Sequence, residues 1–186
     1  MISNNKQDQF VRRLKKGDRA AFNEMVVAYR ERGFAIAYRM VGNAEDAKDI
    51  LQEAFIRVFT NINHFKEKAH FHTWLYRIVV NCAWDHLRKR KKHKMESTQA
   101  AESEVFNDEG QSDDTVLNNE LASTIDSCAR RLSDRQRSCF ILKYQNGLSI
   151  YEIAETLGCN ASTVKVHLFR ALGKMRKALN AYKKGG

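Results

Sequence analysis

The sequence contains no proline, and strand-like alternation of apolar and polar residues is absent. Every apolar repeat has the spacing of a helix, so we predict an all-α fold. No stretch approaches the length of a membrane span, and the amino terminus, MISNNKQDQF, lacks the apolar run of a signal peptide. We therefore expect a cytoplasmic protein with no stable membrane insertion.

Cysteine is scarce, with four residues, and no two of them form a C-x-x-C pair. Their wide spacing argues against a zinc site or a disulfide framework. Cys82, Cys128 and Cys159 fall on apolar faces of expected helices, so we expect buried free thiols in a reducing compartment.

Basic residues are missing from one long segment. Between Met95 and Ala129 there is no Lys or Arg, while nine of the chain's 22 acidic residues lie there. The remainder carries all 32 basic residues against 13 acidic ones, although the net charge of the whole chain is only +10. This uneven charge predicts two basic domains on either side of an acidic connector, and a polyanionic partner.

The helical stripes place the domain boundaries. Stripes over residues 1–94 can close one core, and residues 117–186 suffice for a second domain of four helices. Residues 95–116 have few large apolar side chains, so their burial could not offset the conformational entropy lost on folding. We expect two small helical domains joined by a flexible acidic linker. Asn43 and Ser133 are expected to cap helices, and Phe59 to be buried in the helix after Asn43.

The segment 153–168, IAETLGCNASTVKVHL, has the spacing of a helix-turn-helix. Ala154 is small where two helices cross, Gly158 allows a tight turn, and Val164 and Leu168 anchor the second helix. The opposite face of that helix suits the DNA major groove, where cations and short polar side chains meet phosphates and base edges. Its residues are Ser162, Lys165, Val166, Phe169 and Arg170. An ordinary helical hairpin is the alternative.

A second candidate nucleic-acid face lies on the expected helix that begins near Phe71. This face carries cations that can contact phosphates, an amide that can bind a base edge and an indole on which a base can stack. They are Arg77, Asn81, Trp84 and Arg88, followed by the basic run to Lys94. The alternative is that Trp84 packs against another element of the protein, because large aromatic residues are more often core than ligand sites.

These motifs together resemble a known family. Segments 43–55 (NAEDAKDILQEAF) and 71–78 (FHTWLYRI), with Asn81 and 85–88 (DHLR), closely resemble the first domain of bacterial sigma factors. Segments 132–137 (LSDRQR), 151–154 (YEIA) and 162–165 (STVK) resemble their last domain. The short chain and single acidic linker are similar to the extracytoplasmic-function (ECF) group of the sigma-70 family. Ser133 departs from the pattern, since the family usually has proline there, and Val166 replaces a residue that is often small and polar.

The resemblance implies a transcription initiation factor that binds core RNA polymerase and promoter DNA. The helix-turn-helix face would read the −35 element, and Arg77, Asn81, Trp84 and Arg88, with the loop 65–70, would open the −10 element. The helix 44–59 would dock on polymerase, through Asp46, Asp49, Gln52 and Glu53 off its apolar stripe. The acidic linker would thread toward the polymerase active-site channel, and a separate anti-sigma factor would hold the free protein inactive.

Other functions fit the sequence less well. A dimeric helix-turn-helix regulator would explain the second domain and leave the first unexplained, and a general RNA-binding protein would show little sequence preference. His70 and His72 have no third metal ligand at a defining spacing, and there is no Gly-rich phosphate loop. We therefore expect no catalytic residues, no metal and no cofactor.

Overall fold

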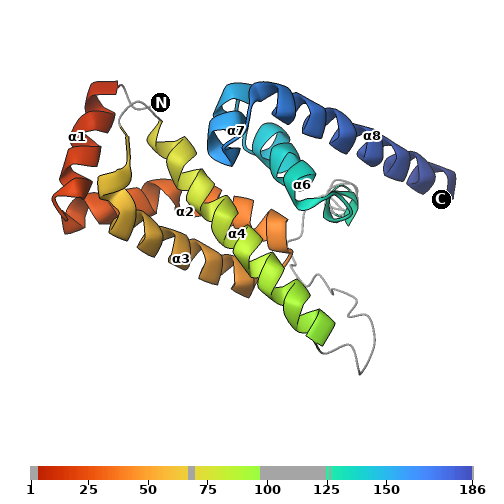
Figure 1. The fold of residues 1–186 in the computed structure, drawn as a ribbon, viewed down its shortest axis with the longest axis horizontal. Helices are drawn as coiled ribbons and strands as arrows, with labels where there is room; N and C mark the ends of the chain where they lie inside the picture. The colour runs from red at the N-terminus through yellow and green to blue at the C-terminus, as the bar shows by residue number, and fades with distance from the viewer. Residues whose placement is uncertain (1–3, 67–69, 97–124, 126, 186) are drawn as a thin grey trace, which may run out of the picture.

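The computed structural model describes residues 4–66, 70–96, 125 and 127–185. All regular structure within these ranges is helical, as predicted (Figure 1). The first domain contains α1 (Asn4–Lys15), α2 (Arg19–Val41), α3 (Ala44–Asn61), the 3-10 turn η1 (Ile62–His64) and α4 (Phe71–Glu96). The second contains α6 (Asp134–Phe140), the π-helical turn η2 (Ile141–Gln145), α7 (Ile150–Leu157) and α8 (Ala161–Gly185). The expected acidic linker lies almost wholly outside the described residues.

Local capping sets the helix boundaries of the first domain. The Asp18 carboxylate accepts hydrogen bonds from the backbone N–H groups of Ala20 and Ala21, which starts α2. Gly42 ends that helix in the left-handed region, and Asn43 caps α3 by accepting from the Asp46 N–H at 3.0 Å, as predicted. α2 therefore ends and α3 begins within a few residues, so the chain can reverse and the two helices can pack against each other.

The first core fills the space between α1, α2, α3 and α4. Gly33 in α2 allows the close approach of α3, because a Cβ atom there would lie only 2.7 Å from Leu51 Cδ1. Phe71 at the start of α4 lies within aromatic contact of Phe10 and Phe65, with ring centroids 5.5 and 5.6 Å apart. The prediction that Phe59 is buried is wrong: its side chain is 48% exposed, because the buried stripe of α3 is narrower than its apolar stripe.

The predicted helix-turn-helix is confirmed in the second domain. Ser149 and Glu152 form a reciprocal capping box at the start of α7, with N···O distances of 3.2 and 2.8 Å. Gly158 makes the turn with φ of +63°, and Val164 and Leu168 are buried against α7 and the core around it. Ser133 does stand at the N-terminus of α6, but its side chain makes no capping hydrogen bond there, so that part of the prediction is wrong.

The beginning of the second domain is only partly described. Leu117 and Leu121 of the expected helical stripe lie outside the described residues. Ile125, Cys128 and Leu132 pack with Phe140, Ala171 and Met175, so α8 is held on this side by a small core of its own. Cys82, Cys128 and Cys139 are buried free thiols, whereas Cys159 is half-buried and lies in the turn after α7 rather than on a helix face.

The two domains are docked on each other. α6 and α7 lie against α2 and α4, while α8 runs along the side of α6 and α7 that faces away from α4 (Figure 1). One apolar core continues from the first domain into the second, through residues that include Cys139, Leu142 and Leu157. The sequence predicts two domains joined by a flexible linker and does not determine how they are arranged; in the structure they pack against each other.

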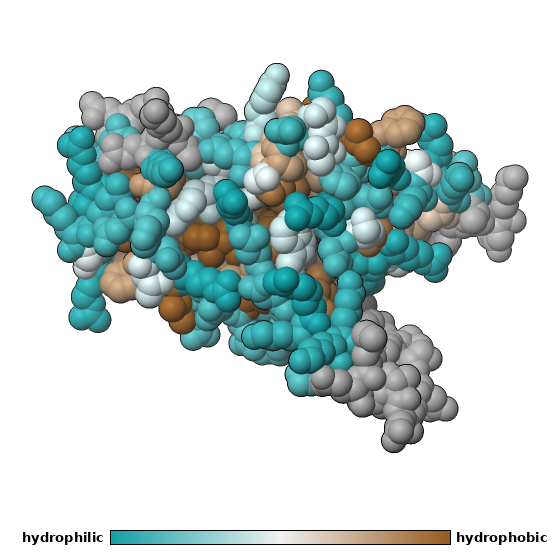
Figure 2. All heavy atoms as spheres, in the orientation of Figure 1, coloured by the Kyte–Doolittle hydropathy of each residue, from teal (hydrophilic) through white to brown (hydrophobic). Residues whose placement is uncertain are grey.

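Hydrophilic residues cover most of the face shown in Figure 2, and apolar residues show between them in small areas. None of the described helices is long and apolar enough to cross a membrane.

The turn at Gly158 allows a first prediction. Gly158→Ala should lower the free energy of unfolding by about 1–2 kcal/mol, because φ of +63° strains any residue with a Cβ atom. Gly173→Ala is the matched control, since Gly173 lies within α8 with no atom within 4 Å of its would-be Cβ, so stability should be equal or higher by up to about 1 kcal/mol. Urea unfolding of both variants measures this, and equal effects at the two positions would contradict the assignment of the turn.

Candidate nucleic-acid and polymerase interfaces

The outer face of α8 presents all five residues predicted to read duplex DNA. Ser162, Lys165, Val166, Phe169 and Arg170 are exposed, and Phe169 is 81% exposed. The buried stripe of the same helix points the other way, so the exposed apolar side chains are not needed for folding. The arrangement leaves cations, a hydroxyl and apolar side chains free to meet the edges of base pairs.

The electrostatics of this region favour an anionic ligand. Burial lowers the pKa of His167, and the nearby guanidinium groups of Arg135 and Arg170 lower it further. Two arginines are therefore close enough to disfavour a third positive charge. Such a concentration of positive charge next to the exposed face of α8 suits a phosphate backbone.

The residues of the second predicted nucleic-acid face, on α4, differ in exposure and in their contacts in this structure. Asn81 and Arg88 are exposed, and Arg88 forms an ion pair with Asp85. Trp84 is half-buried, and its indole N–H donates to Ser138 Oγ of the second domain at 3.2 Å. Arg77 is exposed, yet its guanidinium lies 3.0 Å from where a Cβ atom on Gly158 would stand. The packing alternative for Trp84 is therefore what the docked conformation shows.

The predicted polymerase-facing residues of α3 are also not equivalent. Asp49 and Gln52 are exposed, and Asp49 has no ion-pair partner among the described residues. The Asp46 carboxylate lies 3.2 Å from His86 Nε2, and Glu53 accepts from Arg57 Nε at 2.8 Å. The hydrogen bond that Arg57 donates to Glu53 is the main cause that raises the pKa of Arg57. Asp46 and Glu53 thus help to hold α3 and α4 in place, and Asp49 is the carboxylate most available to a partner.

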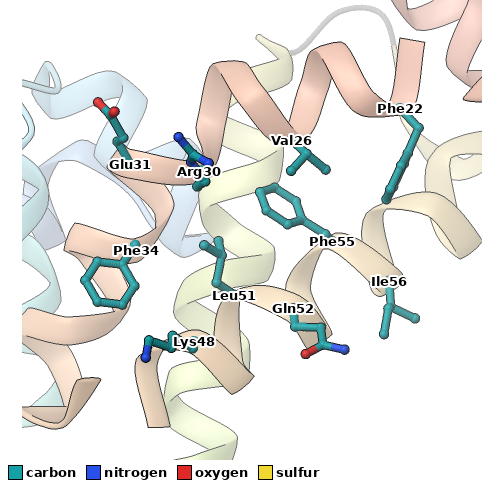
Figure 3. A pocket seen from close by; sticks show the side chains of 10 residues that line it. All are labelled: Phe22, Val26, Arg30, Glu31, Phe34, Lys48, Leu51, Gln52, Phe55 and Ile56. Atoms are coloured by element: carbon teal, nitrogen blue, oxygen red, sulfur yellow. The ribbon is translucent and has the colours of Figure 1, made fainter. Parts of the chain in front are cut away.

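Beside these residues lies an apolar groove that the sequence reasoning did not find. It has a volume of about 640 Å³ and runs between α2 and α3, where Val26, Leu51 and Phe55 point toward one another (Figure 3). Gln52 and Lys48 line its edge, so it is continuous with the predicted polymerase-facing surface. Exposed Ile56, which also lines it, was the available signal, because an isoleucine off the buried stripe suggests an interface.

Among the described residues no cluster of three or more His, Cys, Asp or Glu could hold a metal ion. His70 and His72 stack on each other with centroids 5.5 Å apart, and His72 Nε2 lies 3.0 Å from Glu152 Oε1 of the second domain. The hydrogen bonds from Ser149 and His72 outweigh the effect of burial on Glu152, and its pKa lies below the ordinary value. The predicted −10 loop, residues 65–70, is only partly described, since 67–69 lie outside.

The exposed face of the helix-turn-helix and the basic face of α4 are those of a two-domain nucleic-acid-binding protein. Residues 25–93 match the family described as Sigma-70 region 2, and residues 123–175 match Sigma-70, region 4. The chain is 37% identical over 176 residues to the ECF RNA polymerase sigma factor SigW of Bacillus subtilis (strain 168), covering 91% of this chain and 94% of that protein. It is 31% identical over 186 residues to the RNA polymerase sigma-H factor of Pseudomonas aeruginosa, covering 96% of each.

Two solved structures show the same fold. The sigma factor RpoE from Bartonella quintana, in complex with the anti-sigma factor NepR, has a TM-score of 0.70, with 86% of this chain and 96% of that chain covered at 21% identity. CnrH in complex with the cytosolic domain of CnrY has a TM-score of 0.67, with 94% and 97% covered at 23% identity. The chain therefore belongs to the ECF group of RNA polymerase sigma factors, a family of transcription initiation factors.

Proposed function

We propose that this chain binds core RNA polymerase in the cytoplasm, directs it to specific promoters and has no enzyme activity of its own. The observation that supports this most is that a chain of the sigma-factor family exposes the predicted reading residues of α8 together with Arg77, Asn81 and Arg88 on α4. A dimeric regulator would need only the helix-turn-helix. It would leave the basic face of α4 and the apolar groove beside α3 without a use.

The division of labour follows from the surfaces. In this proposal residues 117–186 read the −35 duplex through Ser162, Lys165, Val166, Phe169 and Arg170. Residues 1–94 engage the opened −10 strand through Arg77, Asn81, Trp84 and Arg88. A flat aromatic ring and an amide suit an unpaired base, whereas a protruding helix suits a duplex groove.

The partner proteins would use the first domain. Core polymerase would bind α3 at Asp46, Asp49, Gln52 and Glu53, with an apolar side chain of polymerase in the groove between α2 and α3. An anti-sigma factor would compete for the same helix, as the fold shared with two sigma factors in such complexes suggests. The linker, residues 95–116, would approach the active-site channel of polymerase.

The main test is transcription with purified components. The chain, core RNA polymerase and supercoiled genomic DNA should give a defined set of transcripts that neither protein gives alone. Binding of a palindromic duplex by the free chain, without transcripts at any salt concentration, would favour the dimeric regulator and contradict the proposal.

A second prediction concerns base reading by α8. Arg170→Ala should cost about 1–3 kcal/mol in binding to the preferred −35 sequence if the guanidinium makes a bidentate base contact. Selection of promoter variants by the reconstituted holoenzyme should then show relaxed preference at one position. Arg176→Ala, at another exposed arginine of α8, is the control and should leave the preference unchanged. A uniform loss for every sequence with Arg170→Ala would show that this residue contacts only phosphate.

A third prediction concerns the exposed carboxylate on α3. Asp49→Lys should weaken binding to core polymerase about fivefold to tenfold, because it replaces attraction to a basic surface by repulsion. Glu155→Lys makes the same charge change at an exposed position of α7 and should leave affinity unchanged. Competition between labelled wild-type chain and each variant for core polymerase, without DNA, measures the difference. Equal affinity of the two variants would remove Asp49 from the interface.

A further inference from the structure

A glycine interrupts the row of side chains on α8 near the middle of the helix. Gly173 neither begins nor ends α8, and glycine is unfavourable inside a helix because it loses more backbone entropy than any other residue. Its backbone is not in the left-handed region that explains Gly158. A Cβ atom at Gly173 would have nothing within 4 Å. Neither the backbone nor the packing of the described residues therefore requires a glycine at this position.

Gly173 lies on the face of α8 that is proposed to read duplex DNA. It follows Val166 by seven residues, Phe169 by four and Arg170 by three, which are the spacings of side chains on one helix face. At about 100° per residue, it projects about 160° away from Ala171, which belongs to the buried stripe. The open position left by the missing side chain, the Gly173 notch, is therefore part of the exposed face.

Two cations follow the notch on the same face. Arg176 and Lys177 come three and four residues after Gly173, and both side chains are exposed. Side chains on an α-helix lean toward its N-terminus, so these two reach back toward the notch. The sequence of α8 contains no acidic residue that could neutralise them. The notch thus combines room for a close approach to the helix backbone with two positive groups beside it.

The position of the notch along α8 places it beyond the residues that would contact bases. With a rise of about 1.5 Å per residue, Ser162 to Phe169 span about 10 Å, and Gly173 lies about 6 Å further along. The major groove of B-DNA is about 12 Å wide, and a recognition helix contacts base edges with its N-terminal residues. A helix that places Ser162 to Phe169 in the groove therefore brings the notch to the sugar–phosphate backbone at its edge.

We propose that Gly173, Arg176 and Lys177 bind a phosphate group of the DNA backbone beside the −35 element. The missing Cβ atom lets the DNA backbone approach the helix closely, and the guanidinium and ammonium groups bind the phosphate. This contact carries no sequence information, but it fixes the depth and register of α8 in the groove. The choice of promoter DNA as the ligand rests on the proposed function, to which the notch adds a contact outside the five reading residues.

The notch is tested with Gly173→Ala and Gly173→Leu in holoenzyme reconstituted with core RNA polymerase. The probe is a labelled duplex that carries the −35 segment of a promoter recovered by transcription. Affinity should fall about threefold for alanine and about tenfold for leucine, because the added atoms hold the phosphate away from the cations. The loss should be the same for preferred and altered −35 sequences, since a phosphate contact does not distinguish bases.

Stability separates this role from a structural one. Alanine and leucine favour a helix, so urea unfolding should show both Gly173 variants to be at least as stable as the wild type. Asn180→Leu is the matched control, because Asn180 is exposed on the same face but lies about 27 Å from Ser162 along the helix. Its affinity for the duplex should be unchanged. Wild-type affinity of Gly173→Leu, or a loss as large in Asn180→Leu, would contradict the proposal.

The phosphate itself is identified with duplexes that carry one neutral methylphosphonate linkage at successive positions beside the −35 element. One linkage should weaken binding by the wild type about fivefold and have little further effect on Arg176→Ala or Lys177→Ala, because each variant already lacks part of the same contact. Lys174→Ala removes an exposed cation from another side of α8, and it should keep the full effect of that linkage.

The remaining outcomes are distinguishable. Wild-type holoenzyme that shows no preference for the −35 duplex would refute the proposed function and the notch together. Wild-type preference without any linkage coupled to Arg176 or Lys177 would refute the notch alone. Weaker binding of Arg176→Ala and Lys177→Ala to core polymerase without DNA, again with no coupled linkage, would assign these cations to an acidic protein surface instead.

Discussion

The placement of the second domain depends on the buried guanidinium of Arg137. It is 8% exposed, and burial lowers its pKa, but each of its three hydrogen bonds reaches a backbone carbonyl rather than a carboxylate. Two of those carbonyls, of Ala129 and Arg130, lie shortly before α6, and the third, of Met40, lies in the last turn of α2. The same side chain therefore shapes its own domain and joins it to the first, since a buried cation without these acceptors would be strongly unfavourable.

Local features of the fold were predictable because their causes lie within a few residues. Ala154, Gly158 and Val164 are spaced by the geometry of one turn, and Asn43 caps the helix that follows it directly. The docking was not predictable, because the Arg137–Met40 hydrogen bond joins positions 97 apart. In the sequence Arg137 is one basic residue among many, and no periodicity marks it as buried.

The candidate sites likewise differ in how far the sequence predicts them. The exposed face of α8 follows from helical periodicity, since the residues that anchor the helix determine which ones remain free. On α4 the periodicity identifies the stripe that carries Trp84, but it does not determine which group packs against the Trp84 ring. A base and the helix-turn-helix domain both present a flat or cationic group to an indole, so the two alternatives predict the same residues. The apolar groove was missed because it needs two helices, α2 and α3, at a distance set by Gly33.

The free energy of docking between the two domains depends on an apolar core and on polar contacts at its edge. A shared apolar core favours the docked arrangement, and the polar contacts at its edge, His72–Glu152 and Lys91–Asp134, are partly exposed pairs of a kind that contributes roughly 0–1 kcal/mol each. Moving such an equilibrium from almost closed to almost open takes about 5.5 kcal/mol of differential binding, which one protein interface of ordinary size can supply. The contacts that hold the domains together lie on α4, α6, α7 and the last turn of α2, while the surfaces proposed for polymerase and the −35 duplex lie on α3, on the groove between α2 and α3, and on α8. The surfaces proposed for polymerase and the −35 duplex are therefore largely separate from the contacts that hold the two domains together.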